Sequence, residues 1–210
     1  MTLEVVTLVL GPVQTNAYLI GETQSKEAVV IDPAWDGKKI IHEAEKRGWR
    51  ITHVWLTHAH FDHFGGVAEI VDECHPSPSV ALHEEDLPLW KLQGGAPLFG
   101  FRIDPGPEPS VMLRHGQKLY LGKYEVEVRH TPGHTRGHVV FHIPGERLCF
   151  CGDVIFQGSI GRTDLPGGDY HQLLESIRLQ ILSLPDEVRL LSGHGPETLV
   201  GIERLENPFL

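Results

Sequence analysis

The sequence lacks the two features that mark a membrane or an exported protein. In 210 residues no apolar run approaches the roughly 20 residues that a membrane helix needs. The chain also does not open with a basic segment followed by an apolar one, as a signal peptide would. We therefore expect a cytoplasmic protein that makes no contact with a membrane.

Clustered positive charge and paired cysteines are lacking too. Lysine and arginine number 18 against 28 aspartates and glutamates, and the formal net charge is −10. A nucleic-acid groove or a surface for anionic lipids needs a basic cluster, so we expect neither. The three cysteines, Cys74, Cys149 and Cys151, are an odd number, which argues against a disulfide framework. We expect Cys149 and Cys151 to be small buried residues of a strand.

Histidine is abundant, with 14 in the chain. Residues 57–63 read Thr-His-Ala-His-Phe-Asp-His and follow an apolar, β-rich run, so they begin where a strand ends. His58 and His60 are two positions apart on an extended segment and point the same way, whereas Asp62 and His63 follow where a helical pattern starts. Neutral imidazoles at this density share a divalent cation well. The stretch predicts a metal site, with a histidine-rich surface turn as the alternative.

Apolar runs and turn residues divide the chain into two β-rich halves, each followed by a helix. A hydrophobic fraction of 40% is enough for a core at this length, and we expect a single domain over residues 1–210. The halves predict an α/β protein with two sheets face to face and helices outside. The expected strands are 4–10, 17–20, 28–31, 51–56, 79–82, 118–121, 124–129, 139–143 and 148–151, and the expected helices follow Asp36, span 64–73 and span 170–182.

Residues 83–110 have no regular pattern, because prolines and glycines interrupt them, yet they contain many leucines and aromatic residues. A disordered linker would be polar, and a long irregular segment in a compact domain is usually functional. We expect a lid or substrate-binding loop. The alternative is a contact between copies of the chain in a homo-oligomer.

Three further candidate ligands lie just past apolar strands, each beside a glycine. They are His134 in 130–135, Asp153 in 150–153 and His194 in 190–195. In a sandwich of two sheets this placement brings them to one edge. Asp32 also lies at a strand end, where it either supports a ligand from behind or only shapes the turn before Pro33.

The order of these residues resembles the metal-binding pattern of the metallo-β-lactamase fold superfamily, and the match spans most of the chain. The resemblance implies a four-layer αββα sandwich, with two mostly antiparallel sheets and helices outside, and a metal site at the sheet edge. It implies two divalent metal ions. The first would be held by His58, His60 and His134, the second by Asp62, His63 and His194, and Asp153 would bridge them.

Within the superfamily, residues 158–169 and 203–209 resemble the compact bacterial glyoxalase II-like proteins, which hydrolyse hydroxyacyl thioesters such as S-lactoylglutathione. Main-type β-lactamases lack a histidine at the position of His63 and have a cysteine where this chain has Asp153, so we expect no antibiotic hydrolysis. Larger glyoxalase II enzymes carry a C-terminal helical domain that helps bind glutathione. Only 16 residues follow His194 here, so we expect no such domain, and the thiol need not be glutathione.

The implied mechanism is attack on a small-molecule thioester by a hydroxide that bridges the two metals, with Asp62 as the catalytic residue that orients it. Nitrogen and oxygen ligands suit zinc, iron or manganese, and we take zinc as the first expectation. Residues 161–164 also resemble persulfide dioxygenases, which hold one iron at the positions of His58, His134 and Asp153. A metal-stabilised binding module without catalysis is the third hypothesis. Arg162 either binds a substrate carboxylate or acts as a structural clamp.

Overall fold

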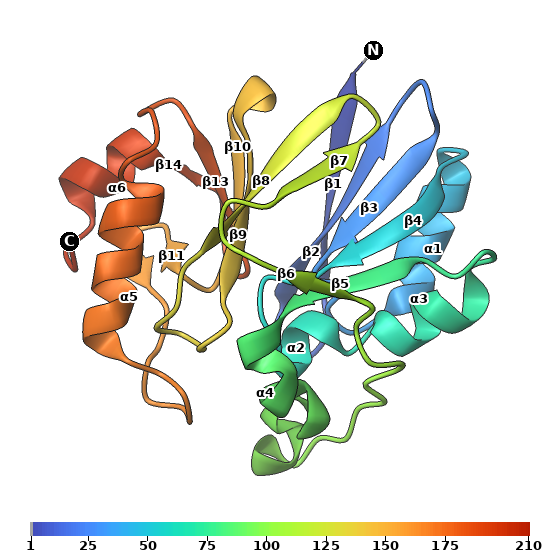
Figure 1. Ribbon diagram of the computed structural model, residues 1–210, viewed down its shortest axis with the longest axis horizontal. Coiled ribbons are helices and arrows are strands. Elements are labelled where there is room, and N and C mark those ends of the chain that lie inside the picture. The colour runs from blue at the N-terminus through green and yellow to red at the C-terminus, as the bar shows by residue number, and fades with distance from the viewer. Residues whose placement is uncertain (1) are drawn as a thin grey trace.

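The computed structural model describes residues 2–210 and consists of two six-stranded sheets packed face to face. Figure 1 shows helices α1 and α3 outside the first sheet and α5 and α6 outside the second, with α2 and α4 at one end of the sandwich. This arrangement confirms the expected αββα sandwich. Among the described residues, no helix combines the length and the apolar character that crossing a membrane requires.

The first sheet has the strand order β1-β2-β3-β4-β5-β6. Its first three strands pair antiparallel, as a meander, but β3, β4, β5 and β6 are parallel neighbours. The expectation of two mostly antiparallel sheets is therefore wrong for this sheet, because each crossover returns the chain to the same end before the next strand. The strands are β1 Leu3–Leu10, β2 Thr15–Glu22, β3 Glu27–Ile31, β4 Arg50–Trp55, β5 Ser79–His83 and β6 Val111–Leu113.

The second sheet has the order β14-β13-β10-β9-β8-β7 and is mostly antiparallel, as expected, with β10 and β13 as its parallel pair. A short ribbon of β11 and β12 lies between β10 and α5 in the sequence. The strands are β7 Lys118–Leu121, β8 Tyr124–His130, β9 Val139–Ile143, β10 Leu148–Gly152, β11 Ile155–Phe156, β12 Ser159–Ile160, β13 Arg189–Ser192 and β14 Thr198–Leu199.

The helices are short and serve as covers and crossovers. The expected helix 64–73 is two helices, because the chain turns at Gly65 and Gly66. Asp36 occupies the N-cap position of α1, but its side chain makes no capping bond and pairs with Lys39 instead. The helical segments are α1 Gly37–Lys46, α2 Phe61–Phe64, α3 Val67–Glu73, η1 Glu84–Asp86, α4 Leu87–Lys91, η2 Gln93–Phe99, η3 Pro144–Glu146, α5 Tyr170–Ser176, η4 Ile177–Ile181 and α6 Val200–Glu206.

Three apolar layers hold the sandwich together, and successive strand residues alternate between them. Val29 faces the layer between the sheets, whereas Val30 faces the layer under α1 and α3. In the second sheet Phe150 faces the inner layer, and Cys149 and Cys151 face the layer under α5. Both cysteines are buried and unpaired, as expected.

The inner layer gives the first stability prediction. Phe141 is fully buried there, and its ring lies 5.6 Å from that of Trp55 across the two sheets. We expect Phe141→Ala to lower the free energy of unfolding by about 3–5 kcal/mol, because burial is lost and a cavity is left. Tyr120→Ala is the control, since Tyr120 is 56% exposed, and should stay within about 0.5 kcal/mol of the parent. Denaturant unfolding of both variants measures the free energy of unfolding. Equal losses in the two variants would contradict the stabilising role of Phe141 in the inner layer.

Candidate metal centre

The candidate ligands meet where several strands end at one edge of the sandwich. β4 ends at Trp55, and the loop after it carries His58 and His60 into α2. β10 and β13 run in parallel with Gly152 beside Ser192, which places Asp153 and His194 just past neighbouring strand ends. Glycine fits at Gly193 because a Cβ there would collide with Asp153 Oδ1 and with the ring of His63. The pattern of strand, glycine and ligand thus has a steric reason.

The first group of donors consists of His58, His60 and His134, whose ligand atoms all lie within 4.8 Å of one another. His60 Nδ1 is 2.9 Å from His134 Nε2. His134 Nδ1–H donates to the carbonyl of Arg162 at 2.8 Å, which directs Nε2 into the centre. The structure therefore brings together the set that the resemblance implied for a first metal.

The second group consists of Asp62, His63 and His194, again with ligand atoms within 4.8 Å of one another. Asp62 Oδ2 lies 3.3 Å from His194 Nε2 and 3.5 Å from His63 Nε2. Thr15 Oγ1 donates to the same carboxylate oxygen at 3.0 Å. His63 is fully buried, whereas His194 is half-buried and faces a cavity.

Asp153 lies between the two groups. Its Oδ1 is 3.3 Å from His63 Nε2, and its Oδ2 is 3.6 Å from both His134 Nε2 and His194 Nε2. One carboxylate thus contacts imidazoles of both groups. This is the position that a bridging ligand requires.

Burial and charge set the protonation states of these donors. Burial, together with the neighbouring imidazoles, holds the pKa of His58 well below its usual value and that of His60 at about 3. Burial alone would raise the pKa of Asp62, but His63 and His194 outweigh it and hold it at about 2. Burial would lower the pKa of His63, yet the carboxylates of Asp153, Asp62 and Asp32 raise it well above normal. The surroundings of the second group therefore favour positive charge.

Divalent cations fit this donor set. Three buried side-chain atoms have no hydrogen-bond partner among residues 2–210, namely His58 Nε2, His63 Nε2 and Asp153 Oδ1. Each unpaired buried polar atom costs about 1–3 kcal/mol, and all three belong to candidate ligands. Metal ions bound by the two groups would satisfy them, and a mixed nitrogen and oxygen set suits zinc, iron or manganese.

Asp32 supports two ligands from behind. Its Oδ2 accepts from His63 Nδ1 at 2.9 Å and from Thr57 Oγ1 at 2.6 Å, and His58 Nδ1 lies 3.0 Å from that same hydroxyl. Its Oδ1 accepts the backbone N–H of Thr57 at 2.8 Å. These bonds hold the protons on Nδ1 and leave Nε2 of both histidines free to bind. Asp32 was expected either to support a ligand or only to shape the turn before Pro33, and these bonds favour the support of a ligand.

Removing the charge of Asp32 should weaken metal binding. An amide in Asp32→Asn presents hydrogens to His63 Nδ1 where the carboxylate accepts one, so we expect metal affinity to fall about 10- to 100-fold. Competition with a coloured chelator measures the affinity. Asp36→Asn is the matched control, because among the described residues the Asp36 side chain pairs only with Lys39, near the surface. Equal affinity in both variants would remove Asp32 from the centre.

Of two further supporting residues, Asp86 could not be recognised in the sequence, and His138 could be recognised only as one of several histidines at strands or strand ends, any of which could assist a ligand. Asp86 is buried and accepts from Ala59 N, Thr135 Oγ1 and Gly137 N at 2.7–2.9 Å, so it connects the loops that carry the first group. His138 Nε2 accepts the backbone N–H of Asp153 at 3.1 Å. Asp86 follows two glutamates and resembles an exposed acidic run, and its partners are 27 or more residues away.

Comparison with known proteins identifies the family. Residues 10–194 match the sequence model described as metallo-beta-lactamase superfamily. The chain belongs to this superfamily. A Bacillus subtilis member named probable metallo-hydrolase YqgX is 38% identical over 204 residues, which cover 96% of this chain and 94% of that protein. A Haemophilus influenzae member named hydroxyacylglutathione hydrolase GloC is 36% identical over 200 residues, which cover 94% and 93%.

Solved structures of superfamily members agree. The structure titled BLEG-1 B3 metallo-beta-lactamase has a TM-score of 0.92 at 40% identity and covers 99% of both chains. TTHA1623, titled as a di-iron-bound form, has a TM-score of 0.89 at 40% identity and covers 98% of this chain and all of that one. ETHE1 from Myxococcus xanthus has a TM-score of 0.81 at 26% identity, covering 98% and 83%. One of these names indicates an activity and another a metal, while the fold is shared by all three.

Proposed function

We propose that the protein is a hydrolase that uses two divalent metal ions, with zinc as the first expectation, to cleave hydroxyacyl thioesters. One observation carries the proposal: two complete donor groups lie side by side, with the carboxylate of Asp153 between them. The names of the Bacillus and Haemophilus relatives, a metallo-hydrolase and a hydroxyacylglutathione hydrolase, support this reaction class.

In the reaction, water adds its oxygen to the acyl carbon, the carbon–sulfur bond breaks, and a carboxylic acid and a thiol leave. Divalent cations held by the two groups supply Lewis acidity, which makes water a nucleophile near neutral pH and polarises the carbonyl oxygen. The carboxylate of Asp62 remains ionised, because its pKa is about 2, and can accept a hydrogen bond from the attacking water. Thr15 and His194 hold that carboxylate in place.

A persulfide dioxygenase is the second candidate, because the structure also brings together His58, His134 and Asp153, the set that such an enzyme uses for one iron. His134 Nε2 lies 3.6 Å from Asp153 Oδ2. That reaction has no use for Asp62, His63 and His194 as ligands, although all three face the centre. Such enzymes can retain these ligands unused, so the names of the Bacillus and Haemophilus relatives, together with the second group, are the reason that we place hydrolysis first.

Three assays on one preparation distinguish the activities. We expect thiol release from S-lactoylglutathione or another hydroxyacyl thioester under anaerobic conditions. Oxygen uptake with glutathione persulfide, without thioester cleavage, would support the dioxygenase instead. Cleavage of a chromogenic β-lactam faster than any thioester would overturn the proposal in favour of the activity named for BLEG-1. A preparation that holds metal but turns over none of these substrates would support the binding module.

A further inference from the structure

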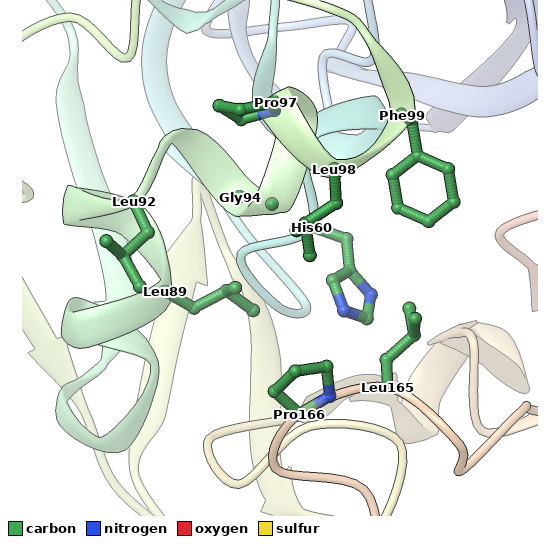
Figure 2. A pocket seen from close by; sticks show the side chains of 10 residues that line it. His60, Leu89, Leu92, Gly94, Pro97, Leu98, Phe99, Leu165 and Pro166 are labelled. Carbon is green, nitrogen blue, oxygen red and sulfur yellow. The ribbon is translucent and has the colours of Figure 1, made fainter.

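An apolar cavity of about 240 Å³ lies beside the metal centre. Figure 2 shows it between the segment α4–η2 on one side and the loop at Leu165 and Pro166 on the other, with the imidazole of His60 between them. We call it the apolar pocket. Its walls contain aliphatic and aromatic side chains and glycine backbone, and the main ones are Leu89, Leu92, Leu98, Phe99, Leu165 and Pro166.

The apolar pocket continues into the metal centre. His60, Phe99 and Leu165 also line an adjoining cavity whose other walls include Asp62, Asp153 and His194. One molecule can therefore place an apolar group in the apolar pocket and the bond to be cleaved at the metal centre. This continuity points to part of the substrate, and not to a separate ligand, as the occupant.

The walls select for apolar chemistry. Among residues 2–210, no ionisable side chain apart from His60 lines the apolar pocket, and its leucines remain accessible, with Leu92 and Leu98 exposed by 68% and 72%. Exposed apolar surface around a concave site is typical of a binding surface. The nearby guanidinium of Arg162 is engaged, because its Nε and Nη2 donate to both oxygens of Asp164 at 2.7 and 2.8 Å. A charged group such as a glutathione carboxylate therefore finds no partner in this pocket.

Building on the proposed hydrolase activity, we propose that the substrate is a thioester with an apolar arm, which the apolar pocket binds. A water molecule takes up roughly 30 Å³ of liquid, so the cavity has room for about eight atoms or groups of that size. This corresponds to a medium-length alkyl chain or an aryl group. Both the acyl group and the thiol can supply this arm, and the experiment separates them. Each methylene that enters the pocket should raise kcat/KM about threefold to fourfold.

Two series of substrates test the proposal. The first keeps one small neutral thiol and lengthens the acyl group from acetyl to octanoyl; the second keeps one acyl group and lengthens the thiol. We expect kcat/KM to climb in one series and to level off near eight carbons. Leu98→Asp should lower the ratio of octanoyl to acetyl turnover, or its thiol counterpart, at least tenfold. Leu205→Asp is the matched control, because Leu205 is 84% exposed on α6, and should leave both rates unchanged.

A binding measurement separates failure of this inference from failure of the proposed function. We expect calorimetry to show octanoate or octanethiol binding at least tenfold more tightly than its two-carbon counterpart, and Leu98→Asp to remove the difference. If thioesters are cleaved at rates that do not depend on chain length in either series, the inference of an apolar arm is wrong and the proposed hydrolase function stands. If the long ligand binds selectively but no thioester is cleaved, the apolar pocket remains a binding site and the proposed thioesterase function is wrong.

Discussion

Replacing Asp62 by alanine is expected to lower kcat for thioester hydrolysis at least about 100-fold while the protein remains folded. The Asp62 carboxylate is ionised and half-buried, and its Oδ2 lies 3.3 Å from Nε2 of His194, another member of the second donor group. The substitution removes both a candidate ligand and the acceptor that would orient the attacking water. Because Asp62 is not part of the apolar layers, although its α2 neighbours Phe61 and Phe64 are buried, the loss should be catalytic.

The control for this variant is Asp72→Ala, which removes a carboxylate from the exposed face of α3. Steady-state kinetics, metal content and the unfolding midpoint are measured for both variants. The expected result is a large loss of kcat in Asp62→Ala alone, with an unfolding midpoint close to that of the parent. Unchanged turnover in Asp62→Ala would eliminate Asp62 as the catalytic residue.

Replacing His134 by alanine is expected to remove most of the metal from the first group. Its Nε2 lies 2.9 Å from His60 Nδ1 and 3.6 Å from Asp153 Oδ2, so its loss leaves two imidazoles and a shared carboxylate. Loss of a supporting partner alone costs about 10- to 100-fold in metal affinity, and loss of a direct ligand should cost more. Turnover should fall together with the metal content.

His171→Ala is the matched control, because His171 lies exposed at the start of α5. Metal per chain is measured after dialysis against a weak chelator, and activity is measured with and without added zinc. Partial recovery at high zinc would support a weakened site. A His134→Ala protein with undiminished metal and activity would remove this residue from the ligand set.

The candidate metal centre could be proposed from the sequence because its donors follow a repeated local rule. At residues 57–63, 150–153 and 190–195 a strand ends and a ligand follows within three positions, so strand placement alone predicts convergence. Asp32 follows the same rule, because it comes directly after β3, but the other residues that support the donors do not. Asp86 acts on Ala59, Thr135 and Gly137, and His138 acts on Asp153, through contacts that only the folded chain creates.

The structure of segment 83–110 could be predicted from the sequence only in part. Its glycines and prolines indicate irregular chain, yet much of it forms α4 and η2. Gly94 has φ of +61° and lies against the backbone of Phe61 and Ala59, where a Cβ would collide. The segment is thereby packed onto the loop that carries His60. The sequence indicated a lid, but its attachment to the metal loop depends on a backbone contact that no residue pattern encodes.

Arg162 illustrates a case where the sequence left two roles open. Its guanidinium pairs with Asp164, and its carbonyl oxygen accepts the Nδ1 proton of His134. The residue thus positions a candidate ligand through its backbone, and its charge is neutralised locally. This arrangement favours the structural role over the binding of a substrate carboxylate.

Metal content per chain tests the central claim most directly. The protein is purified without added metal and then reconstituted with zinc or iron under anaerobic conditions, and bound metal is counted alongside thioester turnover. The account predicts about two ions per chain, with His194→Ala reducing the number to about one and lowering turnover. About one ion per chain in the parent protein, with full activity in His194→Ala, would contradict the two-metal centre.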